Sequence, residues 1–169
     1  AKNDLQELIT QLLGQMETQF VSQFGLMQQY FSETFQRLFG GGSGEISLSN
    51  PNDPLNCGIE IIVQPPGKKR QLLSLFSGGE RALTAIAILF AMLKLKPTPF
   101  CILDEIEAAL DDANISYFAD YLKEFSKDTQ FIVVTHRKGT MERCDTLFGV
   151  AMEERGISSM VSVNLKDYQ

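Results

Sequence analysis

Two adjacent acids follow a short apolar segment and are the first candidates for chemistry in this chain. Residues 99–103 read Pro-Phe-Cys-Ile-Leu, a pattern typical of a buried β-strand, and Asp104 and Glu105 come directly after it. An Asp at the carboxyl end of a buried strand can hold Mg²⁺, directly or through water. The Glu that follows points to the other side, where it can orient or deprotonate a water molecule. The alternative is a pair of acids at an exposed strand end with no catalytic role.

A turn of small residues, Ser77-Gly78-Gly79, precedes an apolar segment that we expect to be a buried helix from about Glu80 to Leu95. The free N–H groups and the dipole of a helix N-terminus attract anions. Glycines let a phosphate come close to the backbone, and the Ser77 hydroxyl can donate one more hydrogen bond. Because ordinary turns use the same residue types, this motif alone is a weak signal.

The only histidine of the chain, His136, ends a second apolar segment at residues 130–135. A lone histidine is more often structural than catalytic. Open α/β sheets, however, bind ligands at the carboxyl ends of their strands, where His136 is expected to lie. Between the two segments, Leu110 and Asp111 come at the start of another amphipathic helix. Alternation of strand and helix predicts an α/β fold.

A long helix is expected before these motifs. Residues 4–39 contain no proline, and their apolar side chains recur at steps of one, three or four, which keeps them on one face. A helix of this length packs on a partner helix, as in a coiled coil, or on the body of its own domain. Glycines then end it, at Gly40, Gly41, Gly42 and Gly44. The expected strands outside the central motifs are residues 45–49, 59–64, 145–152 and 158–165.

The composition is that of one globular domain of 169 residues, 44% of them hydrophobic. Fifteen Lys and Arg against 21 Asp and Glu leave a net charge of −6, which argues against a dedicated nucleic-acid-binding protein. Three cysteines without a CxxC pair predict neither a disulfide framework nor a zinc site, and indicate a reducing cytoplasm. We find no membrane span and no signal core, and we expect the chain to be a fragment. A local basic patch is still compatible with the sequence, at Lys68, Lys69, Arg70, Arg137 and Lys138.

The order of these motifs resembles the second half of an ABC-type ATPase. In that family, a signature motif like residues 77–80 precedes a Walker B pair like Asp104-Glu105, a D-loop like Leu110-Asp111 and a switch histidine like His136. Over nearly its whole length, the chain also resembles a narrower pattern, that of the C-terminal head lobe of a bacterial SMC (structural maintenance of chromosomes, condensin) protein. It departs from this pattern at two places. The departures are Phe76, where Leu or Met is usual, and Ser43-Gly44, where a bulkier residue is usual. The matching segments are residues 39–42, 64–69, 75–85, 99–111 and 135–142.

This resemblance implies a coiled-coil neck helix in residues 1–39 and an ABC-type head lobe of α/β fold in residues 40–169. An N-terminal lobe would supply the Walker A loop GxxxxGK[ST], which this sequence lacks. Two complete heads would then hold two ATP molecules with Mg²⁺, and the isolated chain is predicted to be inactive. The implied site roles are Mg²⁺ binding for Asp104, catalysis for Glu105 and His136, D-loop for Leu110 and Asp111, and ATP binding across the dimer for Ser77, Gly78, Gly79 and Glu80.

The resemblance also implies the partners of a chromosome-condensing and segregating machine in the cytoplasm, associated with the nucleoid and not with a membrane. They are the N-terminal lobe, a second head, a kleisin subunit and DNA. Kleisin would contact an apolar face of the neck formed by Phe20, Phe24, Met27 and Phe31. The alternative is that this face packs on the missing coiled-coil strand. The alternatives are another ABC-type coiled-coil ATPase of DNA repair, a transporter subunit, or a catalytically inert fragment that holds kleisin.

Overall fold

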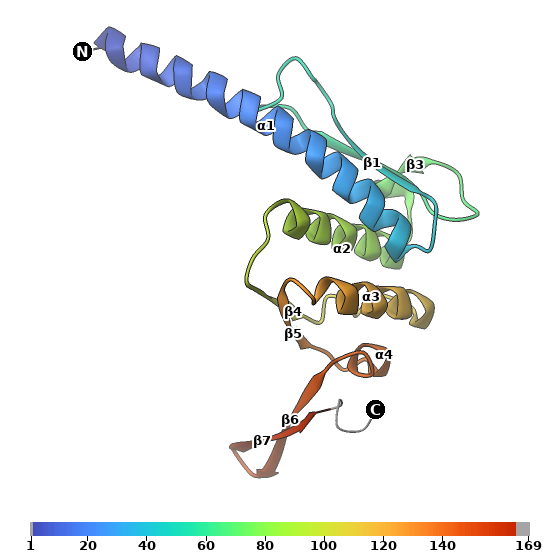
Figure 1. Cartoon of the computed structure of the whole chain (residues 1–169). Helices are drawn as coiled ribbons and strands as arrows, with labels where there is room; N and C mark the ends of the chain where they lie inside the picture. Colours follow the sequence, from blue (N-terminus) through green and yellow to red (C-terminus); the bar gives the residue numbers. More distant parts are fainter. Residues whose placement is uncertain (1, 165–169) are drawn as a thin grey trace. The chain divides into compact units, whose positions relative to one another are not determined.

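The computed structural model describes residues 2–164, which fold as two compact units, one ending at Thr98 and the other beginning at Pro99. The expected mixture of helices and strands is confirmed (Figure 1). The first unit holds α1 (Lys2–Leu38), β1 (Ser43–Leu48), β2 (Ile59–Gln64), β3 (Gln71–Leu72), the 3₁₀ turn η1 (Leu73–Leu75) and α2 (Gly78–Leu95). The second holds β4 (Phe100–Asp104), α3 (Asp112–Phe125), β5 (Gln130–Val134), α4 (Lys138–Met141), β6 (Thr146–Glu154) and β7 (Ile157–Asn164).

In the first unit, the C-terminal part of α1 packs against α2 and β1. Phe31, Phe35 and Leu38 are fully buried there, as the apolar stripe of this helix predicted. A Lys94–Glu33 ion pair, 3.4 Å between Nζ and Oε2, links the two helices. The first half of α1 extends past the other elements of this unit (Figure 1), and its apolar side chains are exposed, among them Leu5, Leu8, Ile9 and Leu12.

The glycine run ends α1 as expected. Gly40, Gly41 and Gly42 all have positive φ, a conformation that L side chains rarely adopt. Strand β1 then pairs antiparallel with β2, and β2 pairs antiparallel with β3. Gly44 serves a different purpose, because a Cβ atom there would lie only 2.7 Å from Phe35 Cγ and 2.9 Å from Phe31 Cε1. The two phenylalanine rings therefore occupy the space next to Gly44 where a larger side chain would otherwise fit.

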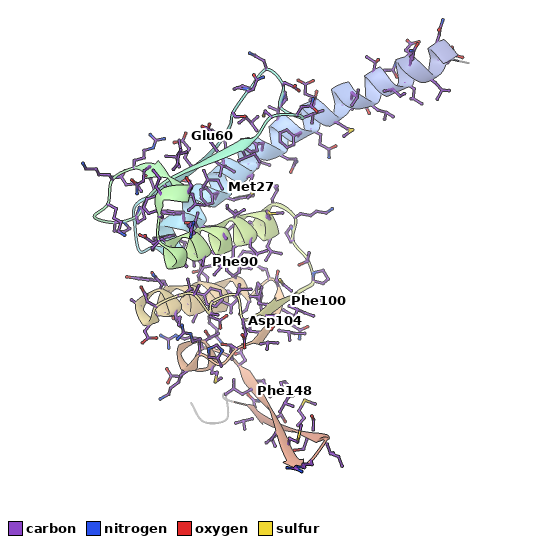
Figure 2. All side chains as sticks on the ribbon, turned by 180° about the vertical axis from the view of Figure 1, so that it is seen from behind. Met27, Glu60, Phe90, Phe100, Asp104 and Phe148 are labelled. Atoms are coloured by element: carbon purple, nitrogen blue, oxygen red, sulfur yellow. The ribbon has the colours of Figure 1, made fainter. Side chains whose placement is uncertain are left out.

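In the second unit, β4 and β5 pair in parallel, from Phe100 opposite Gln130 to Asp104 opposite Val134. Helix α3 contacts one face of this pair, where the Phe125 and Phe131 rings meet edge to face at 5.8 Å. The expectation that both strands are buried is wrong for most of their residues. On the face toward α3, Leu103 is buried and Phe131 and Val133 are half-buried, while the other face is exposed. Its exposed side chains include Phe100 and Ile102 of β4 and Ile132 and Val134 of β5 (Figure 2 labels Phe100 and Asp104).

The two C-terminal strands, β6 and β7, form an antiparallel hairpin. They match the edge strands expected at residues 145–152 and 158–165, although Leu165 lies outside the described residues. Large apolar side chains of the hairpin are exposed on both strands, including Phe148 (Figure 2), Val150 and Met160. Among the described helices of both units, none is long and apolar enough to cross a membrane.

Candidate functional site

The carboxyl ends of β4 and β5 bring together two of the residues singled out in the sequence. Asp104 is the last residue of β4, and the Glu105 N–H donates to the carbonyl oxygen of Val134 at the end of β5, 3.0 Å away. The Glu105 carboxylate then faces the imidazole of His136, with 3.4 Å between Oε1 and Nδ1. Both side chains are more than half exposed, at 55% and 63%, so that a reactant can reach them. Parallel pairing of the strands is the reason that residues 31 positions apart meet.

Glu105 has an unusual backbone. It is the only residue other than glycine with positive φ (48°) among residues 2–164. For a residue with a Cβ atom, this left-handed conformation is unfavourable, and such outliers concentrate at functional sites. Here it turns the chain from the strand into a tight loop, in which the Ala108 N–H donates to the Glu105 carbonyl oxygen at 3.0 Å. The strained residue is thus the same one that presents its carboxylate to His136.

Beneath this pair lies a buried acid that the sequence analysis missed. The Glu107 side chain is 1% exposed, and its Oε1 accepts hydrogen bonds from the hydroxyls of Thr135 and Thr140, the latter at 3.2 Å. A signal for it was present in the sequence, because Glu107 stands in a stretch that otherwise consists of small and apolar residues, Ile106 to Leu110. An acid in such a stretch indicates a buried carboxylate that binds something specific.

Arg137 was expected to contribute to a basic surface patch, but the structure gives its guanidinium a different role. Its terminal nitrogen donates to the carbonyl oxygens of Leu110 at 2.7 Å and of Ala108 at 3.1 Å. Its backbone N–H donates to the Thr135 hydroxyl at 3.0 Å. Of the other patch candidates, Lys68 pairs with Glu80, Arg70 with Glu45 and Lys138 with Glu142, so four of the five cations already have partners within the chain.

The Leu110-Asp111 segment connects this cluster to α3. Leu110 is buried at 2% exposure, and Asp111 is the N-cap of α3, where its Oδ1 accepts from the Asn114 N–H at 2.9 Å. An Asp at this position satisfies one of the otherwise unpaired N–H groups of the first helical turn and favours the helix dipole. The D-loop role expected for these residues stays a prediction, while their contribution to the fold is a helix cap.

The Ser77-Gly78-Gly79 motif lies in the first unit and begins α2. Ser77 is the N-cap of a capping box. Its Oγ accepts from the Glu80 N–H at 3.5 Å and donates to Glu80 Oε2 at 2.8 Å. The Ser77 N–H also donates to Glu80 Oε2, at 3.3 Å. A Cβ atom on Gly78 would meet nothing within 4 Å, so the space before this helix end is open. An exposed helix N-terminus with open space in front of it is suited to an anion.

Lys68, in a loop that precedes α2, forms an ion pair with Glu80. Its Nζ lies 2.8 Å from Glu80 Oε1. Partial burial alone would raise the pKa of the Glu80 carboxyl, but hydrogen bonds from Lys68 and Ser77 outweigh it and hold that pKa below its usual range. The charged carboxylate is therefore the form that fixes the Ser77 hydroxyl.

The described residues contain no group of three or more His, Cys, Asp and Glu side chains arranged to hold a metal ion. Asp104 supplies one exposed carboxylate, at the strand end where it was expected. This donor set fits Mg²⁺ in the manner typical of nucleotide sites, where the ion takes one or two protein carboxylates and completes its shell with phosphate and water.

The apolar residues predicted to bind a partner lie along α1, but they are not equally accessible. The rings of Phe20 and Phe24 stack at 5.8 Å, and both rings and Met27 (Figure 2) are half-buried. Phe31 is fully buried and packs beside Phe35, so it belongs to the core and is not available to a partner. The reason is the turn at residues 39–42, which brings β1 back onto this part of α1. For Phe20, Phe24 and Met27, partner binding stays a prediction.

Comparisons with known proteins show the family to which this chain belongs. Residues 2–159 match the family model described as RecF/RecN/SMC N terminal domain. The chain is 56% identical over 167 residues to the chromosome partition protein Smc of Bacillus subtilis, covering 99% of this chain and 14% of that relative. It thus spans about 14% of the length of the curated relatives that it matches.

Two solved structures are similar to the chain. One, from work on the structural biochemistry of ATP-driven dimerization and DNA stimulated activation of SMC ATPases, has a TM-score of 0.82 and 43% identity, covering 90% of this chain and 92% of the other. The second is the Smc head domain with an extended coiled coil bound to the C-terminal domain of ScpA, from Pyrococcus furiosus. It has a TM-score of 0.86 and 42% identity, covering 99% of this chain and 42% of the other. The chain therefore belongs to the RecF/RecN/SMC N-terminal domain family.

Proposed function

We propose that this chain is the C-terminal lobe of the ATPase head of a chromosome partition protein of the Smc type, which hydrolyses ATP to control chromosome condensation and segregation. The observation that carries the proposal is the Glu105–His136 pair, 3.4 Å apart and exposed, where parallel strands β4 and β5 end. A carboxylate and an imidazole held at that edge are the groups expected to act on the water and phosphate of a nucleotide triphosphate.

Three observations support a lobe rather than a complete head. The sequence contains no GxxxxGK[ST] phosphate loop. This chain covers 92% of a chain in a solved SMC ATPase structure at 43% identity, so the two match over almost their whole lengths. The open face of β4 and β5, with Ile102 and Ile132 about half exposed, is apolar and suited to packing against further strands. An N-terminal lobe would supply both the loop and the cover.

The chemistry proposed for this lobe is positioning and charge stabilisation. Asp104 would help to hold Mg²⁺, which when bound neutralises phosphate charge. Glu105 orients the attacking water and accepts its proton. His136 donates a hydrogen bond to the γ-phosphate. The strained Glu105 backbone supports this role, because such outliers concentrate at functional sites.

The signature residues would act on a second head. Ser77, Gly78 and Gly79 offer a hydroxyl and helix N–H groups to the γ-phosphate bound by the opposite head, with open space before Gly78. Each head would then complete the other's site, and Leu110-Asp111 would lie at the same junction as the D-loop. In this chain Ser77 donates to Glu80, so phosphate binding requires its hydroxyl to change acceptor.

The proposed partners follow from the relatives. Solved Smc heads are bound to the C-terminal or winged-helix domain of ScpA, a kleisin subunit. We propose that this chain binds a kleisin too, through the exposed apolar strands β6 and β7 or through Phe20, Phe24 and Met27 of the neck. The rival role for the neck face is packing against a second coiled-coil strand. DNA is a weaker proposal, with Lys69 and Lys138 as the exposed candidates.

The test is a trapping experiment on the complete head. Glu105→Gln should leave ATP binding intact and slow hydrolysis by about 10²- to 10⁴-fold, the usual worth of a general base, so that crosslinked, ATP-engaged dimers accumulate. Ser77→Arg should bind ATP in one head but form no engaged dimer, because the bulky side chain fills the space before α2. Glu142→Gln, an exposed acid outside the site, serves as the matched control and should behave as wild type. Normal turnover by Glu105→Gln would refute the assignment.

A further inference from the structure

His136 is held by hydrogen bonds made by its two neighbours in sequence. On one side, the Thr135 hydroxyl donates to the buried Glu107 carboxylate and accepts from the Arg137 N–H at 3.0 Å. On the other, the Arg137 guanidinium donates to the carbonyl oxygens of Ala108 and Leu110. The imidazole itself is exposed, and its Nδ1 faces the Glu105 carboxylate. Its position is therefore determined chiefly by the residues on either side.

The same bonds join two loops. Residues 105–111 lead from Glu105 to the N-cap of α3, and residues 135–140 lead from β5 into α4. Glu107 extends from the first loop and binds hydroxyls of the second, at Thr135 and Thr140. Arg137 extends in the opposite direction and binds carbonyl oxygens of the first. Two reciprocal links between short loops make them move together rather than independently.

The two linking side chains also retain unused hydrogen-bonding atoms. Glu107 Oε2 and Arg137 Nε are buried, and neither has a hydrogen-bond partner in the described structure. A buried polar atom without a partner is unfavourable, so the arrangement is not one that packing alone would select. Such groups are retained where a polar link serves the function. No active-site role assigned above uses either residue.

We propose that Arg137 and Glu107 are positioning residues that hold the Glu105–His136 pair in register with the Leu110-Asp111 segment. A contact made by that segment with a second head is then transmitted to the pair through the Arg137 guanidinium. This inference rests on the proposed function for its catalytic consequence, but the placement of His136 by Arg137 does not depend on it. Arg137 is a positioning residue, since its guanidinium is bound to the carbonyl oxygens of Ala108 and Leu110.

The experiment uses the complete head with its histidines isotopically labelled, and the His136 imidazole signals are identified by their loss in His136→Ala. Arg137→Met removes both carbonyl links while keeping a long side chain. It should shift the His136 signals and lower kcat roughly tenfold to a hundredfold, the cost of a misplacement of about 1 Å, with KM for ATP changed by less than about twofold. Arg137→Lys, which keeps a donor, should restore part of both. Lys127→Met is the matched control, since that side chain is exposed in the same unit and has no part in the site, and it should change neither.

The outcomes separate this inference from the proposed function. Unshifted His136 signals in Arg137→Met would overturn the placement, whatever happens to kcat. Shifted signals with an unchanged kcat would overturn the transmission. If Arg137→Met lowers the melting temperature markedly, Glu107→Gln is the milder variant, because it keeps one acceptor oxygen for Thr135; it should still shift the His136 signals. A wild-type head that hydrolyses no ATP would refute the proposed function, and the His136 signals would still test the placement.

Discussion

At the scale of single residues, Glu105 has an unfavourable backbone conformation at the position that the proposed chemistry needs most. Its φ of 48° is normally reserved for glycine, and for other residues it costs about 1–2 kcal/mol. The conformation persists because its N–H pairs with Val134 and its carbonyl oxygen with Ala108. A glycine would relieve the strain but would remove the carboxylate, so selection for folding alone would not favour a glutamate here.

This leads to a prediction about stability. Glu105→Gly should leave the free energy of unfolding unchanged or raise it by up to about 1 kcal/mol, since relief of strain is offset in part by the greater entropy of an unfolded glycine. Glu105→Gln should be as stable as wild type, because it keeps both strain and shape. Both variants should lose hydrolysis. Urea unfolding of the head would check this, and a loss of more than about 1 kcal/mol in the glycine variant would show that the side chain itself stabilises the fold.

At the scale of secondary-structure elements, the start of α2 depends on ionised Glu80. Its pKa is held below the usual range by Lys68 and Ser77, so the carboxylate stabilises the fold above the unfolded pKa of about 4.3, and this contribution is lost as the pH falls through the lowered folded value. Ion pairs with one exposed partner contribute about 0.5–1 kcal/mol. Lys68 itself is half exposed, which sets the value in this modest range.

We therefore expect Lys68→Met to lower stability by about 0.5–1 kcal/mol at pH 7, and the difference from wild type to shrink below about pH 4 as Glu80 becomes protonated in both. Lys69→Met removes the neighbouring charge and is the control. Unfolding midpoints measured from pH 3 to 8 would check it. A Lys68→Met deficit that persists unchanged at pH 3 would mean that the lysine acts through packing of its stem instead.

The junction of α1 and β1 gives a second prediction at this scale. Gly44→Ala would place a Cβ atom within 3 Å of the Phe31 and Phe35 rings, which are fully buried and cannot move without disturbing the core. Overpacking of this kind costs about 1–3 kcal/mol. Gly14→Ala and Gly25→Ala meet nothing within 4 Å and should instead stabilise α1 by about 0.5–1 kcal/mol each. Equal effects at all three positions would contradict the close contact at Gly44.

At the scale of the whole molecule, the sequence predicted most of the fold. The apolar spacing predicted a helix over residues 4–39, and the structure has α1 at Lys2–Leu38. The segments at 59–64 and 130–136 correspond to β2 and β5. These predictions succeed because periodicity and glycine stops are local. The exposed face of β4 and β5 was not predicted, because an apolar strand reads the same whether its cover comes from this chain or from another.

The candidate site was predicted in part. The sequence predicted that Glu105 and His136 each follow the carboxyl end of an apolar strand, and the parallel pairing of β4 and β5 brings the two side chains to 3.4 Å. The buried network of Glu107, Thr135 and Arg137 was not anticipated, because it depends on which side chains point inward at two loops, and loop geometry carries no periodic signal. Phe31 was misjudged for a similar reason: its burial results from the return of β1 onto α1, which helix spacing alone does not reveal.

The most direct test of the central claim is ATP hydrolysis by this chain, measured with and without a separately produced N-terminal lobe that carries the phosphate loop. The account predicts no hydrolysis by the chain alone, hydrolysis by the mixture, and its loss when the chain carries Glu105→Gln. Hydrolysis by a clean preparation of the chain alone, or activity of the mixture that survives Glu105→Gln, would contradict the account.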